Sequence, residues 1–573
     1  MANKKEMKQL ILITGICLSI ALNTFAQPKF LRTMYATDPA TSFTLGFSQD
    51  PASPQNGSDF KLYYGTSDFG IDKVKYAEEN EPLDVYRTTN LKNLDHFFFQ
   101  LKDLTPNTPY YYVISWEDLA GNEYTSKRFW TPTLSNNPND DLSIIAGGDS
   151  RADLENPDQT AQSIIIRQEA NKMVAKLRPH LIAFGGDFTF ANTASEWSDW
   201  FTDWELTYTD DNKITPIVAA IGNHEYPPFG ATDAGSIVVD QMFDVPSKDI
   251  YYALNFHGSL LRLYTLNSEM AIPGDQSKWL VNDLKENDLK VNWKMAQYHK
   301  PIRPHEAGKS DLNDAFENWA QPFYDYQVRL VVESDAHVVK TTYPVMPSFE
   351  SDGTVICGET VDHNFVRTQF RGTTFVGEGT WAALRSGNDA KRWTKDMGGF
   401  NQVKWIWINK DSIEVRTVIT FDIEDENYVS DIENLTEENR FSEPEGIKIW
   451  DPKTSGKITT IYENGLTPFV TEGCEVIATS IENNNPTKNL FTLYPNPLWK
   501  GSLFVKLENA SASSAELKII QFATGKSMKN ETILNQNGKI FTEVNTTSYT
   551  PGFYLVTLKI GAEILSGKVL ILD

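Results

Sequence analysis

Five short apolar segments of the chain each end in a loop that carries Asp, Asn or His, and this repeat limits the fold more than any other feature. In chain order the loops read GDSR, GDFTF, GNHE, YHKPIRPH and ESDAH. Short apolar runs bounded by glycine or polar residues are typical of buried strands, and open α/β sheets place their chemistry at the carboxyl ends of strands. One such loop could be an ordinary turn, but five in succession favour a single shared site.

The polar residues of these loops are of the kinds that bind divalent cations. A carboxylate has two oxygens, so Asp187 in the second loop can hold two cations at once. Hard oxygen ligands mixed with imidazole suit metals such as Mn, Fe or Zn. In chain order the candidate residues are Asp149, Asp187, Asn223, His224, Glu225, His299, His305, Asp335 and His337.

The loops resemble those of the calcineurin-like metallophosphoesterases, and above all those of the purple acid phosphatases. That family's pattern runs GDxG, GDxxY, GNH(D/E), a single His after a strand, and GHxH, and the likeness covers roughly residues 28–420. The resemblance implies two metal sites: Asp149, Asp187 and His337 for the first ion, and Asp187, Asn223, His299 and Asp335 for the second.

The resemblance also implies roles for three residues that are not metal ligands. His224 corresponds to the family's catalytic His beside the substrate phosphate. His305 follows His299 closely, where the family has further substrate-contacting histidines, and is a candidate general acid. Glu225 is expected to orient a neighbouring residue, as carboxylates beside metal ligands often do.

Two positions depart from the family pattern. The ligand Tyr of GDxxY is Phe190 here, and a phenyl ring cannot coordinate iron, so the tyrosinate colour should be absent. The first His of GHxH is Asp335, which replaces a neutral imidazole with a charged oxygen ligand. Together the two changes favour two divalent ions, Fe, Mn or Zn, over a mixed-valence iron centre.

The implied function is that of a secreted, acid phosphatase-like enzyme. It would hydrolyse small phosphate monoesters by attack of a metal-bound hydroxide. A phosphodiesterase on the same ligands is an alternative, because the fold does not decide the substrate. A surface-attached binding protein with a degenerate metal site is a third reading, which Phe190 and Asp335 favour.

The ends of the chain indicate export. Residues 1–26 combine an early lysine cluster with a short apolar stretch and a Thr-Phe-Ala cleavage site, as in a signal peptide. No other segment is apolar and long enough for a stable membrane span. The formal net charge of −24, without a basic stripe, argues against nucleic acid as a partner. Cys357 and Cys474 remain after cleavage and could form one disulfide.

Composition divides the chain further. Residues 27–135 are predicted to be an all-β, fibronectin type III-like sandwich. Residues 140–421 alternate strands with helices such as 163–177, which predicts an α/β metallophosphoesterase domain with a layered β-sandwich flanked by helices. The glycines at 377 and 379 either approach the site or form a bulge. Residues 422–488 are acidic and polar, as in a linker.

Residues 489–573 are expected to form a separate small β-sandwich. The motif LYPNP and the final Gly-Phe-Tyr strand resemble the C-terminal sorting domain of type IX secretion. This resemblance implies the secretion machinery as a partner. It also implies a protein that is released or attached to the cell surface.

Overall fold

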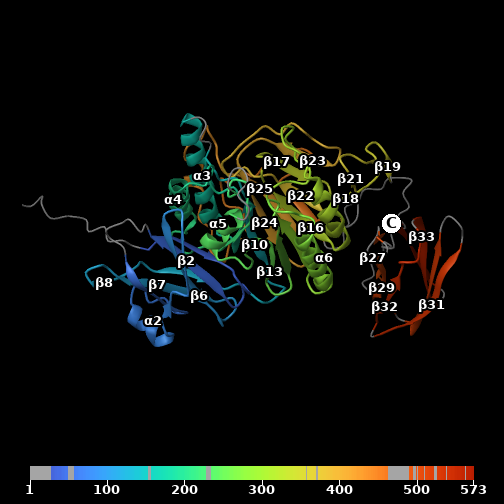
Figure 1. The fold of residues 1–573 in the computed structure, drawn as a ribbon, viewed down its shortest axis with the longest axis horizontal. Helices are drawn as coiled ribbons and strands as arrows, with labels where there is room; N and C mark the ends of the chain where they lie inside the picture. The colour runs from blue at the N-terminus through green and yellow to red at the C-terminus, as the bar shows by residue number, and fades with distance from the viewer. Residues whose placement is uncertain are drawn as a thin grey trace, which may run out of the picture.

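The computed structural model describes residues 28–49, 57–152, 157–226, 234–356, 358–368 and 372–462, and residues 490–572 except 495–497, 500, 509, 511, 522–525, 537, 551 and 562. The predicted signal peptide, Cys357 and Cys474 lie outside the described residues. Figure 1 shows the β-rich N-terminal region in blue, the α/β region in teal to orange and the C-terminal β-sandwich in red. The predicted fold class is confirmed.

The N-terminal region is a β-sandwich. One sheet contains β1 (Lys29–Met34), β2 (Phe43–Gln49), β6 (Leu94–Leu101) and β5 (Arg87–Leu91). The other contains β4 (Leu83–Asp84), β3 (Ser58–Gly65), β7 (Pro109–Glu117), β8 (Glu123–Thr125) and β9 (Phe129–Pro132), with α2 (Lys73–Glu79) beside β3. The rings of Phe47 on β2 and Phe60 on β3 meet between the sheets, 4.8 Å apart.

The N-terminal sheet that contains β1 extends into the α/β region. Within the described residues the first sheet has ten strands. Beyond β1 they are β12 (Ile217–Ala219), β11 (Leu181–Phe184), β10 (Leu142–Gly147), β24 (Gln402–Ile408), β25 (Ser412–Ile419) and β26 (Ile458–Tyr462). Strand β1 pairs in parallel with β12, with Met34 opposite Ile217. The sandwich is therefore joined to the α/β region by backbone hydrogen bonds.

A second sheet packs against the first. Its strands, in order, are β13 (Tyr252–Phe256), β14 (Leu261–Thr265), β15 (Trp293–Gln297), β16 (Val328–Glu333), β22 (Thr374–Gly377), β17 (Val339–Thr342) and β23 (Thr394–Gly398). Alternate residues of a strand face opposite sides. Leu330 and Val332 accordingly join the core between the sheets, whereas Val331 joins the outer core.

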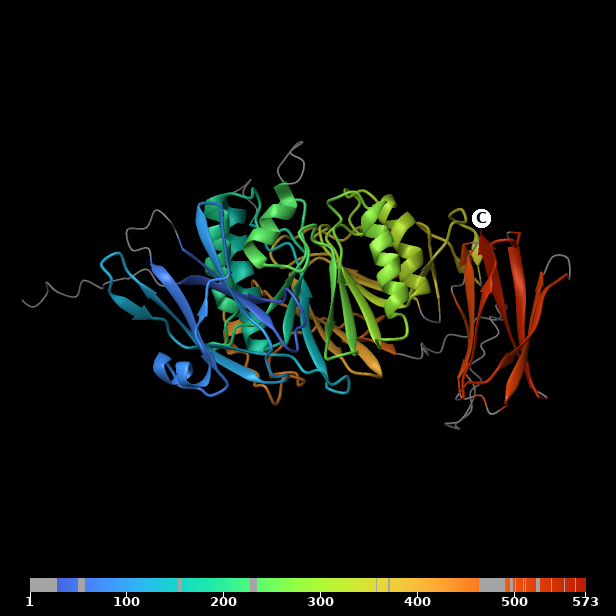
Figure 2. The same ribbon diagram turned by 60° about the horizontal axis from the view of Figure 1, so that its bottom comes forward.

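Helices cover the outer face of each sheet (Figures 1 and 2). Those near the first sheet are α3 (Pro157–Leu177), α4 (Ala194–Trp204), the 3-10 turn η1 (Glu205–Thr207) and α5 (Ala234–Phe243). Those near the second are α6 (Asp275–Asn287), α7 (Asn313–Ala315), the π-helical turn η2 (Phe316–Ala320) and α8 (Gln321–Asp325). Among the described residues, no helix is long and apolar enough to cross a membrane.

A strand-rich insertion lies between β17 and β22. It contains β18 (Val345–Pro347), β19 (Val355–Ile356), β20 (Glu359–Thr360) and β21 (Phe365–Arg367). Strands β18 and β21 pair with each other, as do β19 and β20. Phe365 joins the outer core of the second sheet, so the insertion is packed onto the domain.

The acidic segment after residue 421 differs from the expected linker. Helix α9 (Tyr428–Asp431) and the residues after it pack on the first core through Tyr428, Val429, Ile432 and Leu435. Strand β26 then pairs with β25. The composition of the segment is dominated by acidic residues, so it does not reveal these few apolar residues. The folded segment buries the apolar residues and leaves most carboxylates in solvent.

The C-terminal region is a separate sandwich with its own core. One sheet contains β27 (Leu490–Tyr494), β29 (Ser502–Glu508) and β32 (Ile540–Asn545). The other contains β28 (Leu498–Trp499), β34 (Glu563–Leu572), β33 (Gly552–Ile560), β30 (Ser514–Gln521) and β31 (Ser527–Leu534).

Candidate metal centre

The five loops converge because the strands before them run parallel within each sheet. In the first sheet, β10, β11 and β12 are parallel neighbours. In the second, β15, β16 and β22 are parallel neighbours. Parallel strands end at the same edge of a sheet, and loops at that edge carry function. The loops after β10 and β11 therefore meet those after β15 and β16 between the sheets.

Four candidate ligands have left-handed backbone conformations. The φ angles are 61° at Asp149, 56° at Asp187, 65° at Asp335 and 59° at His337. Residues other than glycine rarely adopt positive φ, and such strain concentrates at functional sites. The conformation turns the chain sharply just after each strand. The four side chains thus lie in the loops and not in the strand ladders.

Two glycines allow these side chains to approach the backbone closely. A Cβ added to Gly379 would lie 1.7 Å from Asp149 Oδ2, and one added to Gly222 would lie 2.2 Å from Asp187 Oδ1. Neither distance is physically possible for a carbon and an oxygen that are not bonded, so any side chain at either position would displace a carboxylate. Of the two alternatives for Gly379, the contact with Asp149 fits an approach to the site.

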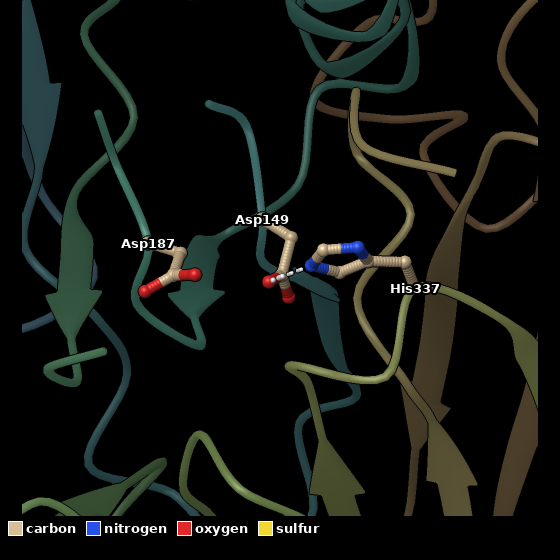
Figure 3. Close-up of side chains that lie close together, drawn as sticks. All are labelled: Asp149, Asp187 and His337. Atoms are coloured by element: carbon tan, nitrogen blue, oxygen red, sulfur yellow. Dashed lines mark ion pairs between the residues drawn. The ribbon is translucent and has the colours of Figure 1, made fainter. Parts of the chain in front are cut away.

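The first candidate cation position is formed by Asp149, Asp187 and His337. All three residues are buried, and each offers one ligand atom within 4.8 Å of the others. Figure 3 shows Asp149 between the other two, with its carboxylate directed at the His337 ring. His337 Nε2 lies 3.0 Å from Asp149 Oδ1. Asp149 Oδ1 is buried and has no hydrogen bond from the part of the chain that the structure describes, which fits an oxygen that coordinates a cation.

The second candidate position centres on His299. Its Nε2 lies 3.1 Å from Asn223 Oδ1, 3.2 Å from Asp187 Oδ1 and 3.6 Å from Asp335 Oδ1. Its Nδ1 lies 2.9 Å from the carbonyl oxygen of Gly185. A carbonyl only accepts hydrogen bonds, so Nδ1 carries the hydrogen and Nε2 remains the ligand atom. Carboxylate, amide and imidazole donors fit a divalent ion here too.

Electrostatics mark both positions as sites for cations. Burial by itself would raise the pKa of Asp187, but His299, His224 and Arg151 outweigh it and hold that pKa below its ordinary value. Burial would likewise lower the pKa of His299, yet the charges of Asp187 and Asp149 raise it well above its ordinary value. In the metal-free protein a proton on His299 thus offsets the charge of the clustered carboxylates, and a bound cation would displace it.

Glu225 ties the second and third loops together. Its carboxylate accepts hydrogen bonds from the backbone amides of Gly222, Asp187 and Phe188, at 2.8, 2.9 and 2.9 Å. Burial, with the nearby charge of Asp187, raises the pKa of Glu225 to about 8. These contacts hold the backbone of the second loop in place, which fits the orienting role expected of Glu225.

Comparison with known proteins places this centre in a family. Residues 152–339 match the family described as calcineurin-like phosphoesterase. The chain carries a calcineurin-like phosphoesterase domain. A phosphoesterase cleaves phosphoric esters and the candidate ligands suit divalent cations, so the chain is a metal-dependent phosphoric ester hydrolase, as its loops predict. Residues 492–572 match the secretion system C-terminal sorting domain, which confirms a secreted or surface-attached protein.

Solved structures share the fold of the phosphoesterase region at low sequence identity. Purple acid phosphatase PPD1 from yellow lupin (Lupinus luteus) seeds aligns with 69% of this chain and 72% of its own, at 15% identity and a TM-score of 0.53. PhoD aligns with 79% of this chain and 94% of its own, at 10% identity and a TM-score of 0.50. No characterised protein matches the chain in a search by sequence.

His224 and Phe190 lie together beside the candidate ligands. The backbone amide of His224 donates to Asp187 Oδ1 at 3.0 Å, and its Nε2 lies 3.7 Å from Asp187 Oδ2. Its Nδ1 contacts the carbonyl oxygen of Phe190, whose ring lies 5.2 Å from the imidazole. His224 therefore points Nε2 toward the ligand cluster, as expected for a residue beside the substrate.

His305 lies in a different environment from the one expected. Its Nε2 lies 2.7 Å from the Thr394 hydroxyl, its Nδ1 lies 3.5 Å from Glu378, and its ring packs on Trp393. The residue is fully buried. The loop that follows His299 places His305 against Glu378, Thr394 and Trp393, so closeness to His299 along the chain does not bring it to the candidate ligands. The structure does not support a substrate contact by His305.

Two cationic residues at the centre were missed by the sequence analysis. Arg151, the last residue of GDSR, places Nε 3.5 Å from Asp187 Oδ2. Lys309 places Nζ 2.7 Å from Asp335 Oδ1. Arg151 stands where the family pattern has glycine, which is a signal in the sequence. Lys309 comes ten residues after His299, and only the return of its loop reveals the contact.

Proposed function

We propose that the chain is a secreted, acid phosphatase-like enzyme that uses two divalent cations to hydrolyse phosphate monoesters. The observation that carries this proposal is the placement of Asp187 between two ligand sets. The residue belongs to the buried group with Asp149 and His337, and its Oδ1 lies 3.2 Å from His299 Nε2. One carboxylate in both sets is what a shared, two-metal site requires.

The residues divide the remaining work between them. When bound, the cations would supply activation of water and neutralisation of charge on the phosphoryl group. His224 would hold or move a proton at Nε2, because Nδ1 faces a carbonyl oxygen and must carry a hydrogen. Glu225 would keep Asp187 and Phe188 in register through their amides.

One observation favours a second function, namely a binding protein with a single cation. The ammonium of Lys309 sits 2.7 Å from Asp335, a ligand of the second position only. A lysine that stays there would take the place of the second ion. The same family also allows diester substrates, so both ester classes belong in the test.

The test is hydrolysis of a chromogenic phosphate monoester and a chromogenic diester by the full chain. The metal-free protein is measured first, and then after addition of Mn, Zn or Fe. Asp187→Asn should abolish turnover. Asp283→Asn is the matched control, because Asp283 lies on the outer helix α6 and its carboxylate pairs with Arg262.

Metal-dependent monoester turnover that Asp187→Asn alone removes would support the proposal. Turnover of the diester alone would favour the phosphodiesterase. Absence of turnover with any metal, in a folded protein that binds one ion per chain, would favour the binding protein.

A further inference from the structure

Arg151 is held at the ligand cluster without a full set of hydrogen-bond partners. Its side chain is only 11% exposed, and among the described residues its Nε has no hydrogen-bond partner, although it lies 3.5 Å from Asp187 Oδ2. One terminal nitrogen lies 3.5 Å from His337 Nε2. A guanidinium has five N–H donors in a planar fork, so most of its bonding capacity toward the cluster is unused.

Phe190 supports Arg151 from one side. The Arg151 guanidinium lies over the Phe190 ring, 5.1 Å from its centre, and the His224 imidazole lies 5.2 Å from the same ring. A cation over an aromatic face is attracted to it, and the ring restricts its motion. Phe190 is therefore a platform between two groups that face Asp187. This explains a phenyl ring where the family has a ligand hydroxyl.

Cations on the ligands would leave Arg151 without its present partners. His337 Nε2 and the Asp187 oxygens are the atoms that would coordinate, so they would no longer accept from a guanidinium. Three carboxylates, Asp149, Asp187 and Asp335, would face two divalent ions together with Arg151 and Lys309. The loaded centre then has a large excess of positive charge, which only an anionic ligand can offset.

We propose that Arg151, supported on Phe190, is a specificity-determining residue that binds a terminal oxygen of a dianionic phosphoryl group. This inference rests on the proposed function and names its substrate class. A monoester near neutral pH carries two negative charges on three terminal oxygens, whereas a diester carries one on two. A planar guanidinium also matches the paired oxygens of a phosphoryl group. Arg151 should therefore favour monoesters over diesters.

The experiment compares the full chain with Arg151→Met and Arg151→Lys. The Met variant keeps the aliphatic length and removes the charge, and the Lys variant keeps the charge and removes the fork. Arg128→Met is the control, because Arg128 also lies on an aromatic ring, 5.4 Å from Tyr111, but in the N-terminal sandwich. Thermal unfolding and metal content are measured for every variant, and Arg151→Lys carries the test if Arg151→Met loses metal.

Two readouts are used: kcat/KM for a monoester and a diester with the same leaving group, and calorimetric binding of inorganic phosphate to the metal-loaded protein. Arg151→Met should lower monoester kcat/KM by about 10- to 100-fold and weaken phosphate binding similarly, as expected for a charge-assisted hydrogen bond. Diester kcat/KM should change by less than about threefold. Arg151→Lys should fall between, and Arg128→Met should change neither.

Equal losses on both esters, or phosphate binding that Arg151→Met does not weaken, would overturn the inference. Failure of the proposed function looks different, because the unsubstituted chain would then hydrolyse no monoester with any metal, whether or not it hydrolyses the diester. Phosphate binding would still decide the role of Arg151 in that case. Weaker binding in Arg151→Met would support an anion site, and unchanged binding would exclude one.

Discussion

The two candidate cation positions share Asp187 but differ in the groups around them. The first position, with Asp149 and His337, is buried, and its ligand atoms already lie within 4.8 Å of one another. The second, around His299, includes Asp335, whose Oδ1 is 2.7 Å from the ammonium of Lys309. The first position is thus preformed. A cation at the second position must displace Lys309 from the Asp335 carboxylate or share that carboxylate with it.

This difference shows how a changed ligand can be compensated elsewhere. Asp335 stands where the family pattern has a neutral His, which adds one negative charge to the centre. Lys309, which lies in another loop, places one positive charge beside this carboxylate. Burial would raise the pKa of Asp335, but hydrogen bonding and charge from His299, with the charge of Lys309, hold it below its ordinary value. We therefore expect the first cation to bind more tightly than the second.

Asp187→Asn should have the largest effect on the comparison, because Asp187 belongs to both candidate positions. The amide carries no charge and offers only one oxygen, so several kcal/mol of stabilisation is lost at the shared ligand. Monoester turnover should fall at least about a thousandfold. Metal content, measured by elemental analysis, should fall at both positions. A variant that keeps two ions per chain would contradict the shared role of Asp187.

Lys309→Met separates the two positions. Removing the ammonium frees Asp335 for a cation, so the second ion should bind about three- to tenfold more tightly, which is the size of a partly exposed ion pair. The first ion should bind as before. Calorimetric titration of the metal-free protein resolves the two steps. Weaker binding of the second ion would mean that Lys309 holds Asp335 in its ligand position instead of competing for it.

His305→Gln tests whether a third histidine belongs to either position. The ring of His305 contacts Glu378, Thr394 and Trp393, so we expect kcat to stay within about threefold. The free energy of unfolding should fall by about 1–3 kcal/mol, because a buried hydrogen-bonding group is disturbed. Denaturant unfolding and steady-state kinetics measure the two effects. A large loss of kcat with unchanged stability would return His305 to the catalytic machinery.

Asp325→Asn compares the metal centre with an ionisable carboxyl group at the opposite edge of the second sheet. Burial, with a smaller contribution from Asp288, raises the pKa of Asp325 to about 8. An unfolded Asp titrates near about 4, so between these values the folded protein binds more protons and loses stability as pH rises. Asp325→Asn has no carboxyl group at this position, so it does not lose this stability as pH rises. Its advantage in Tm should therefore be absent near about pH 4 and greatest near about pH 8.

The same pH series serves as a control for the metal centre. Asp325 ends helix α8, before the first residue of β16, whereas the candidate ligands Asp335 and His337 follow the last residue of that strand. Metal binding by Asp325→Asn should match that of the unsubstituted chain at every pH. A changed affinity would show that the two edges of the sheet are coupled.

Much of the candidate metal centre could be predicted because each candidate ligand lies close, along the chain, to the strand before it. Each of Asp149, Asp187, Asn223, Asp335 and His337 closely follows an apolar run, and a strand followed by a polar loop is visible in a short window. The structure gathers all five, together with His299, between the two sheets. His305 was the exception, because its position depends on how a long loop returns.

The sequence alone determined the order of strands and loops, and with it the family, the candidate cation ligands and the exported class of protein. Only the tertiary structure decided that β1 completes the phosphoesterase sheet, that residues 422–462 pack on its core, and that Arg151 and Lys309 face the ligands. The physical reason is the separation along the chain over which each effect acts. Apolar periodicity is set by neighbouring residues, whereas strand pairing and charge compensation join residues far apart along the chain.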